Sequence, residues 1–314
     1  MKPGKQHPIV KSIKKSAETL NLSKVLVALS GGADSVATAF ALKLAGVNVT
    51  ALHCNFHLRG EESNRDMKFV ENFCHVNDIP LFTKDFDVAY YINLHKGTSI
   101  EMACRELRYN WFFEYMREGG FQRLATGHNA DDNIETFFLN LLRGSGSRGL
   151  KGMESDKGGI WRPLLKFHRE EILEFLKEYG IDFVVDSTNL ENDYRRNFLR
   201  NKIIPLLKSE WKGFESSFDK SIENLYFENL IVEEAVLKAL PSAGSSLTVE
   251  TIMNFPAPLL LIKRHIEPLG PFSTTPEEIL SAIKAEKPHN RTWRLKKGTI
   301  LLNNKKLILN RSTP

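Results

Sequence analysis

Apolar residues divide the first two thirds of the chain into short runs that alternate between two kinds of spacing. Five consecutive apolar residues, 25–29, are typical of a short buried strand. Apolar residues then recur at helical spacing from Val36 to about Ala45, and Gly46 is suited to end that helix. The alternation continues to about Asp186, with strands expected at 47–53, 81–85, 123–126, 160–164 and 183–185, and helices at 61–76, 99–117, 131–143 and 169–179. This pattern predicts an α/β fold, a doubly wound parallel sheet with helices on both faces.

The pattern changes after about Lys212. Residues 215–290 are typical of several short helices interrupted by prolines, and three strands are expected at 292–295, 299–302 and 306–309. We therefore predict two domains, residues 1–212 and a second, smaller and mainly helical domain at 213–314. Within the first domain, the capping box Thr98-x-x-Glu101 predicts the start of the helix at 99–117.

The composition indicates the class of protein and the compartment in which we expect it. The chain has 314 residues, of which 42% are hydrophobic and 26% charged, as in ordinary globular proteins. No apolar run reaches the ~20 residues that span a bilayer, and no signal-type apolar core follows the first lysines. Three widely spaced cysteines, Cys54, Cys74 and Cys104, argue against a zinc or iron–sulfur site and against a disulfide framework. We expect a cytoplasmic protein with no membrane partner.

Positive charge is concentrated in three stretches, although the net charge is only +5. Residues 1–24 hold six lysines against Glu18, and the chain from Lys287 onward holds eight Lys or Arg and no acid. The third stretch consists of Arg195, Arg196, Arg200 and Lys202. Separate basic surfaces suit a polyanion larger than a nucleotide, with solvated surface as the alternative.

A glycine turn joins the first strand to the first helix. Backbone N–H groups at such a junction face an anion, and the glycines allow close approach of phosphate. No Gly-Lys-Ser/Thr follows, so the loop is not that of kinases and GTPases. Asp34 beside phosphates indicates bound Mg²⁺, and a plain strand–helix turn is the alternative. The predicted phosphate-binding residues are Ser30, Gly31, Gly32, Ala33, Asp34 and Ser35.

A second group of polar residues, 126–136, lies where a later strand gives way to a helix. Asp132 and Glu135 are one turn apart, so both carboxylates project from one face of the first helical turn. Acids at a helix N-terminus also serve as plain cap and dipole partners, which is the alternative here. The glycine-rich segment 143–150 follows, and it is suited either to close over a substrate or to act as a surface connection.

In combination these segments resemble the tRNA(Ile)-lysidine synthetases, a family of the ATP pyrophosphatase or PP-loop superfamily. The resemblance covers about residues 20–210. After the Ser30 loop, the matching pieces are His57-Leu58-Arg59, Arg105-x-x-Arg108-Tyr109, His128-x-x-Asp131-Asp132-x-x-Glu135-Thr136, Arg143-Gly144-Ser145-Gly146-x-x-Gly149-Leu150, Arg162-Pro163-Leu164-Leu165, Asp186-Ser187-Thr188-Asn189, and Arg196-Asn197-x-x-Arg200 with Pro205. Phe56, Asn129 and Asn133 depart from the family pattern.

The resemblance implies an adenine nucleotide alpha hydrolase-like fold and a two-step ligation. ATP adenylates the C2 oxygen of the wobble cytidine, position 34, in tRNA(Ile) with a CAU anticodon, and diphosphate leaves. The ε-amine of L-lysine then attacks C2 and expels AMP, which leaves lysidine. The implied cofactors are ATP and Mg²⁺. Because the chain is purely basic from Lys287 onward, we expect the second domain to bind tRNA.

The resemblance also assigns roles to residues. The implied catalytic residues are Asp34, His128, Asp132 and Glu135, with Asp34 and Asp132 as Mg²⁺ ligands. Lysine would be bound by Arg108, Asp132 and Glu135, and tRNA by Arg196, Asn197 and Arg200. The general base that takes the amine proton is left open.

Other functions compete with this one. A PP-loop tRNA thiolase shares the fold, but such relatives generally use cysteine pairs, and this chain has no close pair. An RNA-binding or nucleotide-sensing module without turnover would leave Asp34, Asp132 and Glu135 without a purpose, and an ATP consumption assay would identify it. An NAD synthetase or amidotransferase would leave the basic ends unexplained. The sequence does not fix the oligomeric state, and a homodimer is one candidate.

Overall fold

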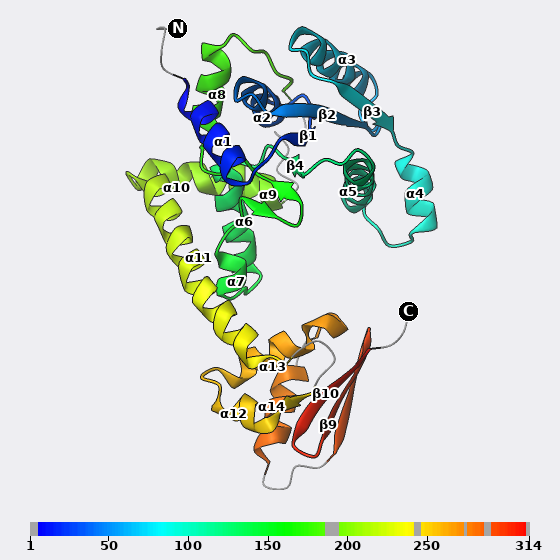
Figure 1. Ribbon diagram of the computed structural model, residues 1–314, viewed down its shortest axis with the longest axis vertical. Helices are drawn as coiled ribbons and strands as arrows, with labels where there is room; N and C mark the ends of the chain where they lie inside the picture. Colours follow the sequence, from blue (N-terminus) through cyan, green and yellow to red (C-terminus); the bar gives the residue numbers. More distant parts are fainter. Residues whose placement is uncertain (1–5, 186–194, 242–245, 273–274, 286–289, 312–314) are drawn as a thin grey trace. The chain divides into compact units, whose positions relative to one another are not determined.

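The computed structural model describes residues 6–185, 195–241, 246–272, 275–285 and 290–311 (Figure 1). The chain divides into two compact units, Met1–Glu223 and Asn224–Pro314. The division falls inside a long helix, α11 (Phe214–Ala239), whereas our prediction placed the boundary after Lys212. The predicted motif at 186–189 lies outside the described residues, as does Lys287.

The first unit is built on a six-stranded sheet. Its strands lie in the order β3 (Leu81–Asp85), β2 (Asn48–Asn55), β1 (Lys24–Ala28), β4 (Arg123–Ala125), β6 (Ile160–Trp161) and β5 (Asp156–Lys157). All neighbours are parallel except β5, which runs antiparallel to β6. The doubly wound parallel sheet is therefore confirmed. The expected strand at 183–185 was wrong, because Val184 pairs only as a single bridge with Gly32 in the loop after β1.

Helices cover both faces of this sheet because alternate residues of its central strand point to opposite sides. Val25 and Val27 of β1 enter a large apolar core, whereas Leu26 packs into a second core with Trp111 and Phe112. The first face carries α1 (Pro8–Thr19), α2 (Ala33–Leu44), α3 (Glu61–Val76) and α8 (Arg169–Glu178), and the second carries α5 (Ile100–Glu118) (Figure 1).

Several elements of the first unit differ from the prediction. Helix α1 was not expected. Helix α5 is capped by Ser99, whose Oγ accepts a hydrogen bond from Met102 N at 3.2 Å. The predicted capping box at Thr98 was therefore wrong by one residue. The remaining helices of the unit are α4 (Val88–Leu94), α6 (Ala130–Leu142), α7 (Ser147–Leu150), α9 (Arg195–Phe198), the π-helix η2 (Leu199–Ile203) and α10 (Ile204–Glu210).

The winding direction of the sheet reverses between its two central strands. From β1 the chain builds outward through β2 and β3 on one side, and through β4 and β6 on the other. In open α/β sheets, ligands bind at the carboxyl ends of the strands where this reversal occurs. The loop after β1 and the segment after β4 both lie at this edge, so the topology brings the two predicted motifs together.

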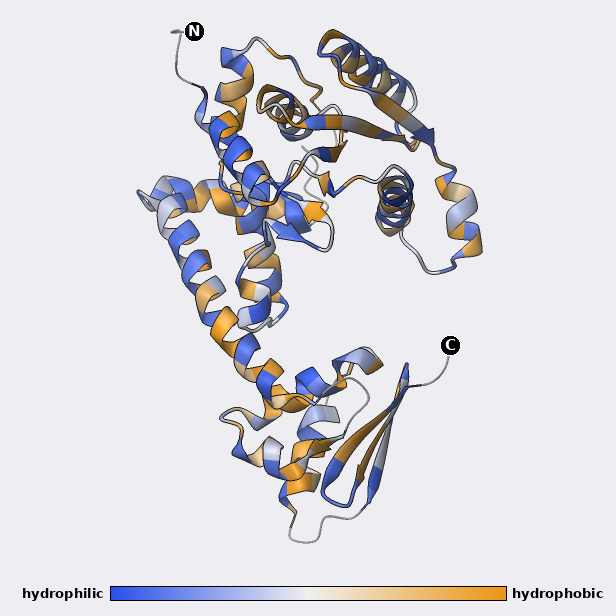
Figure 2. Cartoon of the chain, in the orientation of Figure 1, coloured by the Kyte–Doolittle hydropathy of each residue, from blue (hydrophilic) through white to orange (hydrophobic). Residues whose placement is uncertain are grey.

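The second unit pairs helices with an antiparallel sheet. Its sheet has the order β7 (Leu247–Thr248), β10 (Lys306–Arg311), β9 (Gly298–Asn303) and β8 (Arg291–Leu295). The three expected strands near the end of the chain are thus confirmed. The helices are the remainder of α11, α12 (Val249–Asn254), α13 (Pro258–Ile266), the 3₁₀ turn η3 (Glu267–Leu269) and α14 (Thr275–Lys284). The expectation of short helices alone was wrong for α11, along which apolar and polar residues are both spread (Figure 2).

Candidate active site

The loop after β1 is held open by its two serines. Ser35 Oγ accepts a hydrogen bond from Ser30 N at 3.2 Å and donates one to Gly32 O at 2.8 Å. Gly31 has φ +95°, a conformation that L side chains rarely adopt. The N-cap residue of α2 is Gly32, which has no side chain with which to cap the helix. Its first N–H groups are therefore available to an anion, as a phosphate loop requires.

The segment after β4 packs directly on this loop. A Cβ built on Gly127 would lie 2.8 Å from Asp34 C and 2.9 Å from Ser35 N, closer than real side chains come. Only glycine permits this approach of the two backbones. Gly127 was missing from the predicted site, although its place immediately after a strand was a usable signal.

Asn129, which departs from the family pattern, joins the two predicted motifs. Its side-chain oxygen caps α6 by accepting from Asp132 N at 3.0 Å, and its own N–H donates to Asp132 Oδ2 at 3.1 Å. Its amide nitrogen donates to Asp34 Oδ1 at 3.1 Å. Asp132 thus does act as a cap partner through one oxygen, while its other oxygen faces the site.

Asp132 and Glu135, hereafter the acid pair, face two arginines. Glu135 is only 1% exposed, and its oxygens lie 2.5 Å from Arg196 Nε and 2.6 Å from Arg200 Nε. Asp132 Oδ1 accepts from Arg196 Nη2 at 3.2 Å and from Arg200 Nη2 at 3.0 Å. Two predicted tRNA-binding residues therefore contact two predicted lysine-binding residues. The third, Asn197, lies between them on α9 and is half-buried.

Asp34 and Asp132 supply the hard oxygen ligands that Mg²⁺ prefers. Burial raises the pKa of Asp34, the guanidinium of Arg169 opposes this rise, and the charge of Asp132 adds to it. Arg169 forms an ion pair with Asp34. A divalent cation would offset the repulsion between these two partly buried carboxylates, so the residues fit a bound Mg²⁺.

His128 is held neutral. Burial and the charges of nearby arginines lower its pKa to about 4, against the opposing charge of Asp132. Its Nδ1 lies 2.8 Å from Thr126 Oγ1. At physiological pH this imidazole can exchange hydrogen bonds at the site but carries no positive charge.

Arg108 lies on α5, with its guanidinium carbon 5.3 Å from the centre of the Phe56 ring. Phe56 is another departure from the family pattern, and here it provides a stacking surface. Arg108 also faces the Cys54 thiol, whose pKa burial raises to about 12. The pKa values of Cys74 and Cys104 are raised by burial as well. Such thiols are poor nucleophiles, which weighs against sulfur transfer through these cysteines.

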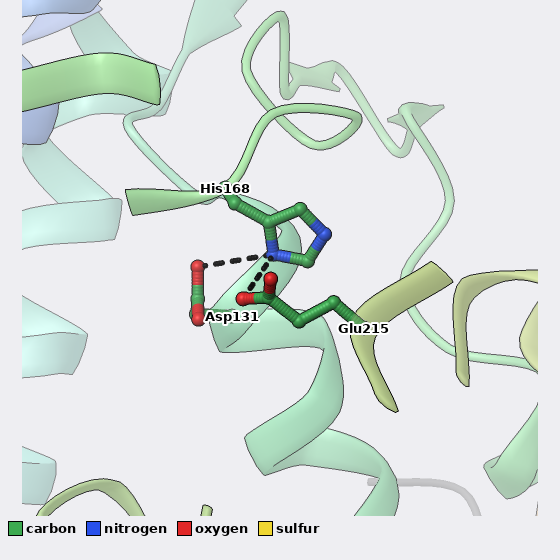
Figure 3. A group of neighbouring side chains, drawn as sticks. All are labelled: Asp131, His168 and Glu215. Carbon is green, nitrogen blue, oxygen red and sulfur yellow. Dashed lines mark ion pairs between the residues drawn. The ribbon is translucent and has the colours of Figure 1, made fainter. Parts of the chain in front are cut away.

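A second charged cluster surrounds Asp131, the residue before Asp132, and was not predicted. His168 Nδ1 lies 3.4 Å from both Asp131 Oδ2 and Glu215 Oε1 (Figure 3). Its Nε2 is 3.0 Å from Asp219 Oδ2. Lys208 Nζ contacts Asp131 Oδ1 at 2.9 Å and also pairs with Glu215. Asp131 and Asp219 raise the pKa of His168 to about 10, so the ring is protonated. Because an imidazolium and an ammonium already pair with these three acids, we assign the five residues a structural role and call them the anchor cluster.

The glycine-rich segment after α6 is fastened by amides of that helix. Asn140 Nδ2 donates to Gly149 O at 2.8 Å, and Asn133 Oδ1 accepts from Met153 N at 2.7 Å. Gly152 has φ +74°, and a Cβ there would lie 2.6 Å from Asn133 Oδ1. Asn133, the remaining departure from the family pattern, thus fixes the end of this segment.

The fold and the phosphate loop define a class of ATP-using protein, and comparison with known families agrees. Residues 5–207 match the family model described as a PP-loop domain. The solved U34-tRNA thiolase NcsA from Methanococcus maripaludis, with its [4Fe-4S] cluster, superimposes with a TM-score of 0.57 at 19% identity, over 69% of this chain and 78% of that chain. At that identity the likeness shows the fold alone.

Curated relatives narrow the class. A tRNA(Ile)-lysidine synthase of Bacteroides thetaiotaomicron is 39% identical over 304 residues, which are 95% of this chain and 71% of that protein. Proteins of the same name from Parabacteroides distasonis and Porphyromonas gingivalis W83 are 41% and 42% identical over 83% and 78% of this chain. The chain belongs to the tRNA(Ile)-lysidine synthase family. It spans 60% and 55% of the length of those last two relatives.

Our predicted family and the use of ATP are therefore confirmed, and the thiolase alternative is not supported. Among the helices that the structure describes, none combines the length and the apolar character needed to cross a membrane. The roles of individual site residues, Mg²⁺, lysine and a homodimer stay predictions.

Proposed function

We propose that this chain ligates L-lysine to C2 of the cytidine at position 34 in tRNA(Ile) with a CAU anticodon, and releases AMP and diphosphate. The observation that carries the proposal is the meeting of two motifs at the reversal point of the sheet. There Asn129 joins the loop carboxylate of Asp34 to the helix that bears the acid pair. The relatives named above, which are longer than this chain, carry a name that agrees with this activity. The charges of the site suit ATP and lysine.

In the first step the chain positions ATP for attack by the C2 oxygen. The uncapped N-terminus of α2 and the hydroxyls of Ser30 and Ser35 would hold the phosphates. Mg²⁺, held by Asp34 and Asp132, would neutralise charge on the departing diphosphate. The ion pair between Asp34 and the half-exposed Arg169 would have to break before Asp34 could bind the metal.

In the second step the acid pair would bind and activate lysine. The ε-ammonium is a cation with a free pKa of ~10.4, so carboxylates both attract it and accept its proton. The amine then attacks C2, the bond from C2 to the adenylate oxygen breaks, and AMP leaves with that oxygen. Arg108 would bind the α-carboxylate of lysine. Neutral His128 would exchange hydrogen bonds with the reacting groups.

Basic residues of both units would bind the RNA. In the second unit, Arg291 and Arg294 are exposed on β8, and Lys296 and Lys297 follow in the turn to β9. Trp293 Nε1 donates a hydrogen bond to Glu278 Oε2 at 3.1 Å, which makes this ring less suited to stack on a base. Its basic neighbours are suited to bind phosphate.

The test supplies ATP, radiolabelled L-lysine and transcripts of tRNA(Ile) with a CAU anticodon, with the CAU-bearing tRNA(Met) as the matched control. We expect label on the isoleucine transcript alone, together with AMP and diphosphate in equal amounts. ADP and phosphate as the products, or no label on RNA, would contradict the proposal.

A further inference from the structure

The site proposed for the lysine amine is occupied by side chains of the chain itself. Arg196 and Arg200 each contact both members of the acid pair, at distances from 2.5 to 3.2 Å. Two guanidinium groups thus balance two carboxylates. In this arrangement no net negative charge remains to attract an ammonium group.

Burial makes the arginines and lysine exclude each other. Glu135 is 1% exposed, and Arg200 Nη2 adds a further contact at 3.1 Å to the two Nε contacts. A carboxylate this buried requires a cationic partner, and its covered oxygens offer no free approach to a second one. Lysine can therefore reach Glu135 only after at least one guanidinium has moved away.

The segment that carries the arginines is suited to move. Both side chains are 41% exposed, so their outer faces are open to a competing anion. Arg196 lies on α9, which has four residues, and Arg200 lies in the π-helix η2. A π-turn is less stable than an α-turn, and its return to α-helical register turns the side chains on its two sides relative to one another by roughly 100°.

We propose that Arg196 and Arg200 determine the order in which substrates bind. Without tRNA they close the amine site. RNA phosphate, which guanidinium groups bind in bidentate fashion, draws them from the acid pair, and lysine then enters. This inference rests on the proposed function, which assigns the acid pair to the lysine amine. Because binding linkage is reciprocal, lysine and tRNA must each raise the affinity for the other.

The first experiment measures binding of labelled L-lysine to the full chain by equilibrium dialysis without ATP, with and without a saturating tRNA(Ile) transcript. We expect tRNA to raise lysine affinity about tenfold, within the usual range of coupling between sites. Equal lysine affinity with and without tRNA would overturn the proposal.

The second experiment removes the competing cations. The double variant Arg196→Gln/Arg200→Gln should bind lysine about tenfold more tightly than wild type without tRNA, and added tRNA should raise that affinity no further. Arg195→Gln, in an exposed residue of the same helix, is the matched control and should keep the wild-type coupling. Weaker lysine binding by the double variant would mean that the arginines help to hold lysine, and would overturn the proposal.

Loss of both arginines leaves Glu135 without a partner, so thermal unfolding must accompany these measurements. If the double variant does not fold, Arg196→Lys/Arg200→Lys keeps the charge but loses the bidentate geometry, and should bind lysine more tightly than wild type by a smaller factor. The lysine transfer assay separates the two proposals. A chain that transfers lysine but shows no coupling refutes only the binding order, whereas a chain that transfers none refutes the function as well.

Discussion

Asp131 and Asp132 are neighbours in the first turn of α6, yet they belong to clusters with different properties. Asp131 faces the anchor cluster, where its partners are His168, Lys208 and the backbone N–H of Arg169 at 2.7 Å. Asp132 faces the site, where its side-chain partners are the partly exposed arginines of α9 and η2. One helix N-terminus therefore has an anchored side and an exchangeable side.

The difference lies in what holds the cations. In the anchor cluster, they come from the start of α8 and from α10, and the acids from α6 and α11, so four elements restrain one another. Around the acid pair, both cations come from one short segment with a π-turn. The ion pairs of the anchor cluster fix the geometry of four elements. The ion pairs around the acid pair can separate, so a substrate can bind its carboxylates.

The sharpest test of this comparison neutralises the acid pair. Asp132→Asn and Glu135→Gln change charge with little change in size, and each should lower lysine transfer about 10³-fold, in the range expected for a lost general base. Asp132→Asn should also raise the KM for Mg²⁺-ATP, whereas Glu135→Gln should act mainly on lysine. Initial rates of labelled lysine incorporation measure both effects, with circular dichroism to confirm folding. Near-normal rates in both variants would leave these acids as cap partners only.

A second prediction concerns the contact that holds the exchangeable side against the phosphate loop. Gly127→Ala places a Cβ 2.8 Å from the backbone of Asp34, so the two motifs must separate. Because small misplacements of reacting groups cost up to about 10²-fold in rate, we expect kcat/KM for ATP to fall 10- to 100-fold. Gly146→Ala is the matched control, since its Cβ meets nothing within 4 Å and its φ is −78°. Equal effects of the two changes would refute this role for Gly127.

These residues also show how far the sequence alone carries the argument. Local periodicity placed β1–β4 and α3 within a residue or two, because strands and helices follow short-range patterns. Helix α1 was missed because six lysines in residues 1–24 obscured the apolar face formed by Ile9, Val10, Ile13 and Ala17. A charged stretch is still a helix when its apolar residues fall on one side.

In the site, too, local features could be predicted from the sequence and long-range contacts could not. Spacing predicted that Asp132 and Glu135 share a face, which is a local property. It could not predict that Arg169 pairs with Asp34, or that Arg200 reaches Glu135, because those partners are more than 60 residues apart in the chain. Contacts of that kind follow from the strand order and from the path of α8 and η2, which one sequence does not encode in any local pattern.

The anchored side gives a third prediction. Asp131→Asn should lower the free energy of unfolding by about 1–3 kcal/mol and change lysine transfer only a few-fold, in contrast to Asp132→Asn. Burial opposes ionisation of Asp131, but His168, the Arg169 N–H and Lys208 together hold its pKa below the usual range. Its stabilising effect is therefore present above the unfolded pKa of ~3.9 and is lost as pH falls, so the variant should lose less stability in acid than wild type does. Denaturant titrations at pH 7 and pH 3 measure this, and a rate loss as large as that of Asp132→Asn would erase the distinction between the two sides.

The smallest effect on activity should come from His168, and its pH dependence identifies the anchor cluster. The carboxylates of Asp131 and Asp219 raise the folded pKa of His168 to about 10, above the unfolded value of ~6.5. The folded state thus holds a proton that the unfolded state releases, so this stabilisation is complete below pH ~6.5 and is lost progressively as pH rises toward 10. His168→Gln cannot carry that charge, so its free energy of unfolding should be about 1–2 kcal/mol below wild type at pH 7, with the gap closing as pH approaches 10. His75→Gln, in an exposed histidine of α3, is the control and should follow the wild-type curve. A constant gap between the His168→Gln and wild-type curves from pH 6 to 10 would show that His168 contributes packing alone, and that the anchor cluster does not depend on its charge.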